Sequence, residues 1–455
     1  MEHNTGEKAI NRNAFGNDFK WGVSVSAYQI EGAYDADDKS LSIWDVFTNR
    51  KGYKGHNGNV ACDFYNNYRS DLQLLKSLNV PNFRFSLAWP RIFPAAGSYN
   101  SKGADYYNRI IDHCLELGIE PWVTLYHWDL PHYLEEKGGW ANRDVVGRFE
   151  EYAERCARQF GDRVKHWMVL NEPLVFTGAG YYMGIHAPGK RGLRNFLPAL
   201  HHAVLCQAQG GRILKELCPR AEVGSTFSCS HVEPYRNTEK DIIAAGKVDA
   251  LLNRLFIEPA LGLGYPFKEL KILQRIEKFI KPGDEKLMAF DFDFTGIQNY
   301  TREVIKHSFF TPYLHASIVS AKSRKAPVTK MNWEIYPQSL YHVIKKYSAY
   351  QGVKKIYITE NGAAFEDVLL QNGRINDLDR RSFIQDCVYQ LYLAKNEGAK
   401  VNGYFIWSFL DNLEWSEGFH PRFGLVYVDF NSQKRIVKAS GEWYRDFLAN
   451  RALLH

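Results

Sequence analysis

Two glutamates end apolar segments of the chain, and their side-chain type and placement suit catalysis. Glu172 follows the segment 167–170 and precedes a proline, and Glu360 follows the segment 355–359. Two carboxyl groups can share the roles of acid/base and nucleophile. Hydrolysis of a glycosidic bond uses such a pair, about 5 to 5.5 Å apart when the configuration is retained. The pair can act only if the fold brings both glutamates to one cleft.

The surrounding pattern predicts an α/β fold that would do so. Segments rich in β-forming residues recur, and each is followed by a loop and by a helical stretch such as 63–78 or 148–160. The expected strands are 19–23, 82–86, 119–126, 165–170, 222–227, 294–298, 355–359 and 402–407. Eight alternating units predict a (β/α)8 TIM barrel with long βα-loop insertions. A doubly wound open sheet is the rival fold, but residues 22–24 offer no glycine-rich phosphate loop.

No linker or low-complexity segment divides the sequence, so we expect residues 1–455 to form a single barrel domain. A barrel enzyme builds its site from the C-terminal ends of its strands. Those ends carry amides, carboxylates, a guanidinium and indoles, which can bind hydroxyls and stack on a sugar ring. They are Gln29, Arg84, His127, Trp128, Asn171, Glu172, Gln298, Asn299, Tyr300, Glu360, Asn361 and Trp407. Strand five ends in Ser228, to which we assign no role.

Several motifs together resemble glycoside hydrolase family 1, the β-glucosidase family, over nearly the whole chain. The motifs are FKWG (19–22), SAYQIEG (26–32), FRFS (83–86), YHWDLP (126–131), NEP (171–173), TENG (359–362) and WSFLDN (407–412) followed by EW (414–415). Their shared order and their positions at strand ends make coincidence an inadequate explanation. The resemblance implies a TIM barrel and a retaining β-glycosidase, most simply a β-glucosidase that acts on terminal β-D-glucosyl residues.

The resemblance also implies roles for single residues. Glu172 matches the acid/base and Glu360 the nucleophile, while Arg84 and Tyr300 match residues that contact the nucleophile. The residues expected to bind the sugar are Gln29, His127, Trp128, Asn171, Tyr300, Trp407, Glu414 and Trp415, with Trp333 as a wall of the leaving-group site. Gln298, Asn299 and Phe423 are further candidates, because the family more often carries asparagine where this chain has Gln298.

Elementary electrostatics supports the same division of roles. An arginine beside Glu360 favours its ionised form, which can attack the anomeric carbon. Burial and repulsion from Glu360 would raise the pKa of Glu172 and keep it protonated until the nucleophile is glycosylated. Asn171 could then donate to the 2-hydroxyl of the sugar, a bond that strengthens in the transition state.

Two alternatives compete with this reading. A subgroup of the family acts on 6-phosphorylated sugars, but it is expected to carry a small residue in place of Glu414, whose charge would repel a phosphate. A non-catalytic sugar-binding barrel is the other alternative, and the presence of both Glu172 and Glu360 disfavours it.

Composition limits the remaining classes. The net charge is +6 without a long basic block, so we expect no nucleic-acid partner. Seven scattered cysteines predict neither a disulfide framework nor a metal site, and we expect no cofactor. The polar N-terminus and the absence of long apolar runs predict a cytoplasmic protein without a membrane partner. The expected ligand is a small or oligomeric β-glycoside. The choice among glucose, galactose and fucose, and the oligomeric state, a homo-oligomer included, stay open.

Overall fold

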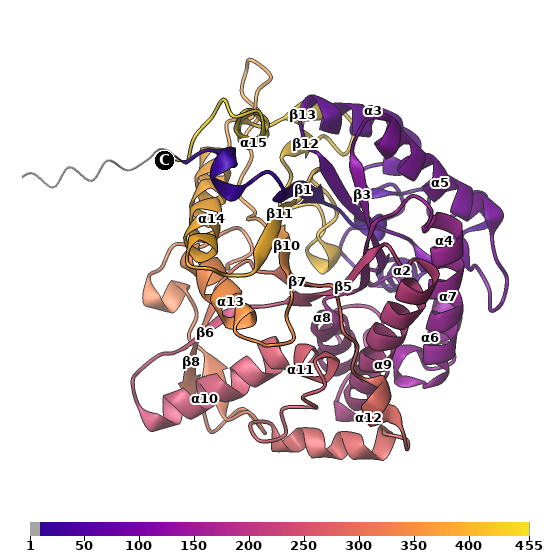
Figure 1. The fold of residues 1–455 in the computed structure, drawn as a ribbon, viewed down its shortest axis with the longest axis vertical. Coiled ribbons are helices and arrows are strands. Elements are labelled where there is room, and N and C mark those ends of the chain that lie inside the picture. Colours follow the sequence, from indigo (N-terminus) through magenta and orange to yellow (C-terminus); the bar gives the residue numbers. More distant parts are fainter. Residues whose placement is uncertain (1–9, 455) are drawn as a thin grey trace, which may run out of the picture.

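A computed structural model describes residues 10–454, and its centre is a closed barrel of eight parallel strands (Figure 1). The strands follow one another around the barrel in chain order, and β1 pairs with both β2 and β11 to close it. They are β1 (Lys20–Ser24), β2 (Asn82–Ser86), β3 (Glu120–Tyr126), β4 (His166–Asn171), β5 (Glu222–Ser228), β7 (Phe294–Gln298), β10 (Ile356–Asn361) and β11 (Val401–Trp407). All eight predicted strands are confirmed within two residues, and closure rules out the open sheet.

Helices surround the barrel because one face of each is apolar. In α7 (Asp144–Phe160) the buried side chains Phe149, Tyr152, Cys156 and Phe160 recur every three or four residues and face the strands. The predicted helical stretches at 63–78 and 148–160 are therefore confirmed, the second starting one turn earlier than expected. The other long helices are α3 (Phe64–Ser77), α5 (Ser101–Glu116), α9 (Leu193–Leu217), α10 (Glu239–Asp249), α13 (Gln338–Ser348), α14 (Leu378–Asn396) and α15 (Ala439–Leu448).

The βα-loops carry structure of their own. Short helices lie in them or next to them: α1 (Ala27–Ile30), α2 (Ile43–Asn49), α4 (Trp89–Ile92), α6 (His132–Glu135), α8 (Pro173–Thr177), α11 (Ile257–Ala260) and α12 (Asp284–Leu287). A small sheet of β6 (His231–Pro234), β8 (Arg302–His307) and β9 (Ala316–Ile318) packs on α10 beside the barrel (Figure 1). A hairpin of β12 (Val426–Val428) and β13 (Arg435–Val437) follows the last barrel strand. The predicted long insertions are thus present.

Aromatic side chains fill the lower part of the barrel. A buried cluster of five side chains, called here the barrel floor, comes from five different strands: Trp122, Met168, Phe294, Tyr357 and Phe405. Glycines make room for it, because a Cβ on Gly22 would lie 2.5 Å from the ring of Phe405 and one on Gly224 would lie 2.4 Å from the ring of Phe294. The barrel interior is therefore packed below, and space for a ligand exists only toward the C-terminal ends of the strands.

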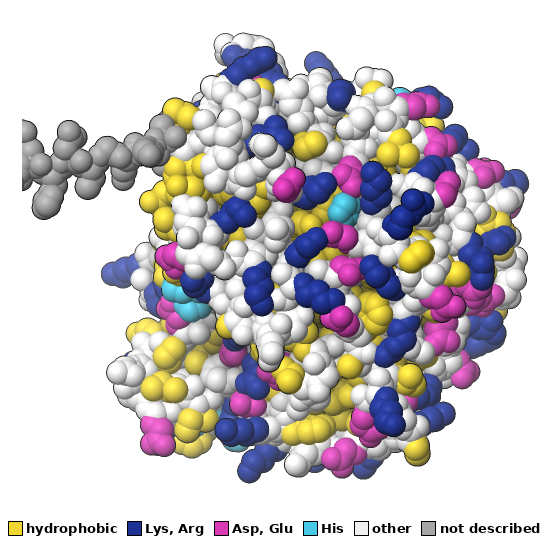
Figure 2. All heavy atoms as spheres, in the orientation of Figure 1, with side chains coloured by type: hydrophobic (Ala, Val, Ile, Leu, Met, Phe, Trp, Pro, Cys, Tyr) yellow, Lys and Arg dark blue, Asp and Glu magenta, His cyan; other side chains and the backbone are white. Residues whose placement is uncertain are grey.

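The face of the molecule in Figure 2 intersperses basic and acidic side chains, in agreement with the modest net charge. Within residues 10–454, no helix is both long enough and apolar enough to cross a bilayer.

Candidate active site

A cavity of about 210 Å³ opens at the C-terminal ends of the barrel strands. Side chains from six barrel strands or the loops that follow them share it with residues of the loop before α13. It is lined by His127, Trp128, Glu172, Val175, His186, Ser228, Tyr300, Met331, Trp333, Glu360, Trp407, Glu414, Trp415, Ser416, Glu417 and Phe423. Ten of these are residues that the sequence predicts for the site, and both glutamates are among them.

Glu172 stands just past β4, where the backbone turns sharply. Its φ is +46°, a left-handed conformation that is rare for residues other than glycine, and its backbone N–H donates to Thr226 O at 3.0 Å. The side chain is buried, and Ser228 hydrogen-bonds it. Burial, followed by repulsion from Glu360, raises the pKa of Glu172 well above its usual range. The environment of Glu172 therefore favours the protonated form of its carboxyl group.

Glu360, the next-to-last residue of β10, accepts hydrogen bonds from two donors. Arg84 Nη1 donates to Oε1 at 2.5 Å, and the Tyr300 hydroxyl donates to Oε2 at 2.7 Å. Burial raises the pKa of Glu360, but Arg84 and Tyr300 both lower it, so these contacts favour the carboxylate. Neither donor is hydrogen-bonded to Glu172 within the described chain. The two glutamates thus occupy one cavity, but Arg84 and Tyr300 bind only Glu360 and favour its carboxylate form.

Arg84 is completely buried on β2, between the barrel floor and the cavity. Its Nε donates to Thr124 Oγ1 at 3.2 Å and to Met168 Sδ at 3.1 Å, and its Nη2 donates to Asn171 Oδ1 at 2.5 Å. All parts of the guanidinium are therefore used, which fixes its position under Glu360.

Indole and imidazole rings gather on one side of the cavity. Trp415 packs on Trp128 with ring centroids 4.5 Å apart, and His127 stacks against Trp415 and Trp407 at 6.0 Å each. Such rings can cover the face of a sugar. Glu414 lies beside them, and Oε2 is buried without a hydrogen-bond partner in the described part of the chain. Burial and the charge of Glu360 raise the pKa of Glu414 to about 8.

Another side of the cavity is apolar. Trp333 lies 5.2 Å from Tyr300 and 6.1 Å from Phe423 between ring centroids, and Met331 packs on the same group. This wall can accept a flat or apolar group attached to a bound sugar.

Five predicted residues lie behind the cavity wall. Arg84, Asn171, Gln298, Asn299 and Gln29 are buried side chains that do not line the cavity.

Protein groups already hold two of these amides. Gln29 Nε2 donates to Asn412 Oδ1 at 3.0 Å and to Leu413 O at 2.8 Å, so it supports the chain next to Glu414. Asn299 Nδ2 donates to Cys229 O and Ser339 Oγ, both at 2.9 Å. Asn299 therefore braces the loops and does not reach the glutamates.

Some lining residues were not predicted. Val175, His186, Met331, Ser416 and Glu417 sit in loops or in short helices, where no strand-end position points to them. His186 packs on Trp128 with ring centroids 5.7 Å apart, and burial lowers its pKa to about 4. The segment 414–417 could have suggested its last two members, since it begins with two predicted residues.

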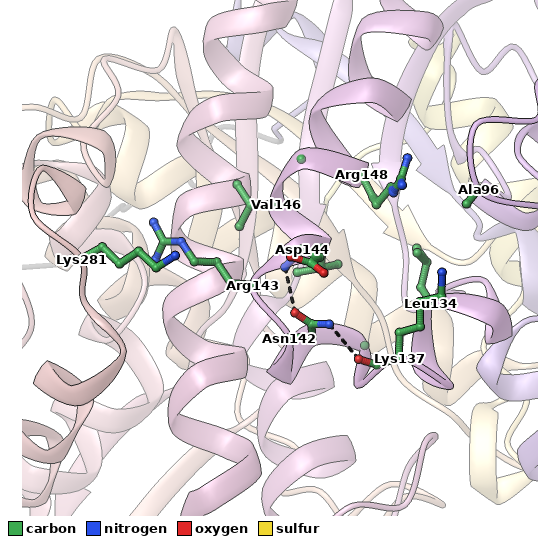
Figure 3. Close-up of a pocket in the computed structure, with 12 residues that line it drawn as sticks. Ala96, Leu134, Lys137, Asn142, Arg143, Asp144, Val146, Arg148 and Lys281 are labelled. Atoms are coloured by element: carbon green, nitrogen blue, oxygen red, sulfur yellow. Dashed lines mark hydrogen bonds between the residues drawn. The ribbon is translucent and has the colours of Figure 1, made fainter.

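The molecule also has a larger hollow, of about 630 Å³, at the start of α7 (Figure 3). Its basic side chains come from α7, from the turn before it and from the loop at Lys281. Arg143 is already paired with Asp284 at 2.8 and 2.5 Å, and Asn142 caps the helix by accepting from Asp144 N at 3.0 Å. These groups are satisfied within the protein, so size does not identify the site.

Known proteins resemble this chain over nearly its whole length. The model of Glycosyl hydrolase family 1 matches residues 11–453. Beta-glucosidase A of Thermotoga maritima is 41% identical over 98% of this chain and 100% of its own length. The 1,4-beta-D-glucan glucohydrolase of Thermotoga neapolitana is 39% identical over 96% of this chain and 98% of its own length. The structure of the Thermotoga maritima β-glucosidase in complex with glucoimidazole is similar with a TM-score of 0.92 at 41% identity, covering 96% of this chain and 99% of that one.

Proposed function

Since this chain belongs to glycosyl hydrolase family 1, we propose that it is a retaining β-glucosidase in which Glu360 is the nucleophile and Glu172 the acid/base. One observation carries the assignment. Both glutamates line the same cavity, yet Arg84 and Tyr300 donate hydrogen bonds to Glu360 and not to Glu172 within the described chain. The donors lower the pKa of Glu360, whereas its negative charge raises the pKa of Glu172. Two carboxyl groups with separated pKa values divide nucleophile and acid between them.

The first step breaks the glycosidic bond. The carboxylate of Glu360 attacks the anomeric carbon, while Glu172 gives its proton to the departing oxygen. The leaving group departs as a neutral alcohol, and the sugar is bound to Glu360 as an ester. Tyr300 and Arg84 then lose their anionic partner, because the carboxylate charge has become a covalent bond.

The second step hydrolyses the ester and regenerates the free enzyme. With Glu360 esterified, the repulsion that adds to the effect of burial on Glu172 disappears, so the pKa of Glu172 falls and its carboxylate can accept a proton from water. The hydroxide so formed attacks the anomeric carbon and the ester bond breaks. Two inversions leave the sugar with its original β-configuration.

Glucose as the sugar is supported by related proteins and by the residues that line the cavity. Related proteins carry the names beta-glucosidase and 1,4-beta-D-glucan glucohydrolase, and a related structure binds glucoimidazole. In this chain Glu414 and Trp415 line the cavity beside Trp407 and His127, as a site for a hydroxylated ring requires. The wall of Tyr300, Trp333, Phe423 and Met331 favours aryl or alkyl leaving groups along with a second sugar.

The decisive measurement is the configuration of the first product. Proton NMR during hydrolysis of an aryl β-glucoside should show β-glucose before mutarotation, and an initial α-anomer would overturn the role of Glu360. Parallel rates on nitrophenyl β-glucoside, β-galactoside and β-fucoside would assign the sugar. Equal rates on 6-phosphorylated and free glucosides would favour the phospho-glycosidase. Tight sugar binding without turnover between pH 4 and 9 would favour a non-catalytic barrel.

A further inference from the structure

Which atoms donate and which accept in the hydrogen bonds behind the cavity can be worked out residue by residue, starting from Arg84. A guanidinium carries only donors. The Asn171 atom that lies 2.5 Å from Arg84 Nη2 must therefore be the amide oxygen. This settles the orientation of the Asn171 amide by chemistry, since oxygen and nitrogen of an amide have similar shapes.

Gln298 lies against the same oxygen. Its amide nitrogen is 2.6 Å from Asn171 Oδ1, and Thr226 Oγ1 is 3.0 Å from it. Because Asn171 presents an acceptor there, Gln298 must present Nε2. β7 sets Gln298 in register with both Ser228 and Glu360, and the side chain is fully buried. Three donors thus converge on one oxygen atom and prevent the amide from turning over.

The fixed amide determines the state of His127. Asn171 Nδ2 lies 2.9 Å from His127 Nε2, and an amide nitrogen can only donate. His127 Nε2 must accept, so the proton of the neutral ring sits on Nδ1. Burial, and then the charge of Arg84, lower the pKa of His127 well below its usual value, which keeps the ring neutral.

The result is a directed donor at the sugar site. His127 lines the cavity, and its Nδ1 has no hydrogen-bond partner in the described chain. A buried N–H without a partner is costly, and a sugar hydroxyl oxygen would satisfy it. Asn171 does not line the cavity, but its Nδ2 has a second N–H beyond the one that His127 accepts, and the family resemblance implies that this N–H donates to the 2-hydroxyl of the sugar.

We propose that Gln298 is a positioning residue that locks the Asn171 amide and so holds His127 in the Nδ1–H tautomer. The tautomer is a property of the free protein. The effect on catalysis rests on the proposed function. Gln298 does not line the cavity itself, and besides contacting Asn171 its side chain hydrogen-bonds Glu360, which lowers the pKa of that carboxyl group.

The first arm of the test reads the tautomer without substrate. NMR of protein labelled with 15N-histidine distinguishes a protonated from an unprotonated ring nitrogen, and the His127→Gln variant identifies the signals. The expected result is a protonated Nδ1 and an unprotonated Nε2 in the wild-type protein. The opposite tautomer, or a doubly protonated ring at pH 7, would overturn the proposal whatever the enzyme hydrolyses.

The second arm measures kinetics of Gln298→Met, which keeps the side-chain length and removes the donor. Loss of one hydrogen bond should lower kcat/KM on an aryl β-glucoside about 2- to 10-fold. The loss should be smaller on the 2-deoxy analogue, which has no hydroxyl for Asn171. Gln207→Met is the matched control, because Gln207 is buried on α9 and accepts from Ser225 outside this chain of bonds. It should leave the ratio of the two substrates unchanged.

Equal losses of Gln298→Met on both substrates, with an unchanged melting temperature, would overturn the positioning role. A wild-type protein that hydrolyses no glycoside but shows the Nδ1–H tautomer would refute the proposed function and leave the hydrogen-bond assignment standing. Failure of Gln298→Met to fold would move the kinetic test to Thr226→Val, which removes another donor to the same oxygen and must show the same difference between substrates.

Discussion

The hydroxyl of Tyr300 donates to Oε2 of Glu360 at 2.7 Å, whereas Arg84 donates to the other carboxylate oxygen, Oε1, at 2.5 Å. Burial and the nearby carboxylates raise the pKa of Tyr300 well above its usual range, so its hydroxyl stays a donor throughout the working pH range. Tyr300 therefore lowers the pKa of Glu360 and orients it without competing for its proton.

Tyr300→Phe should move the acidic limb of the pH profile. Loss of a donor raises the pKa of Glu360, so the limb of kcat/KM that requires the carboxylate shifts to higher pH. A hydrogen bond to a charged group contributes about 1.5 to 3 kcal/mol, which predicts a loss of roughly 10- to 100-fold in kcat/KM. Tyr341→Phe is the control, since Tyr341 donates to surface Glu397 at 2.6 Å. A profile unmoved by Tyr300→Phe would contradict the role of this contact.

Glu172→Ala should separate substrates by their leaving groups. General acid catalysis typically contributes about 10² to 10⁴-fold, and only poor leaving groups need the proton. We therefore expect a loss of that size on alkyl or disaccharide substrates and little loss of the first step on dinitrophenyl β-glucoside. Exposed Glu154→Ala on α7 should leave both rates unchanged. Equal losses on good and poor leaving groups would argue against the acid role.

Glu414 should make the unliganded protein less stable as pH rises. Its pKa in the folded chain is about 8, well above the usual value for glutamate, so the folded protein keeps a proton that the unfolded chain loses. The contribution of Glu414 to stability therefore falls as pH increases from about 4.5 toward 8. Glu414→Gln cannot ionise and escapes this loss.

Melting curves from pH 5 to 8 test this sign. The midpoint of Glu414→Gln relative to wild type should rise with pH, on the order of 1 °C per pH unit. Glu216→Gln, at an exposed position on α9 away from the cavity, should show a constant difference. A Glu414→Gln midpoint that falls relative to wild type over this range would refute the raised pKa.

Lys438→Met should destabilise the protein strongly. Lys438 is completely buried and donates to Asp411 Oδ1 at 2.7 Å and to Asp367, which Arg380 also binds at 2.9 Å. Removing one member of a buried ion pair leaves an uncompensated charge and costs about 3 to 5 kcal/mol. The free energy of unfolding from urea titration checks this value. Lys345→Met should cost about 0 to 1 kcal/mol, because its pair with Glu397 is exposed.

The sequence predicts where the site residues lie better than it predicts how their side chains are oriented. The period of apolar residues located all eight barrel strands, and strand ends located Glu172 and Glu360, because a barrel directs those ends to one face. Orientation of the Asn171 amide depends on side chains from three other strands, and no local pattern records such a meeting. Gln29 was expected to face the sugar, yet its amide nitrogen is bound to Asn412 and to the Leu413 carbonyl, both far away in sequence.

The loops were the least predictable part. Met331 and His186 line the cavity from segments without a regular period, and their approach depends on how long insertions pack on each other. The small sheet of β6, β8 and β9 was not predicted for the same reason, since its strands are short and β6 pairs with β8 across about 70 residues of sequence.

The barrel floor makes the active-site cavity a cul-de-sac. Below Arg84 the rings of Trp122, Phe294, Tyr357 and Phe405 block the barrel, so molecules must enter and leave by one mouth. In the proposed mechanism the leaving group lies nearest the mouth and departs first, while the sugar stays bound to Glu360 at the closed end. Water and any alcohol in solution then compete for the site that the leaving group occupied. In the proposed mechanism, the ratio of hydrolysis to transfer of the sugar to an alcohol thus depends on how water and alcohol compete for entry through this one opening.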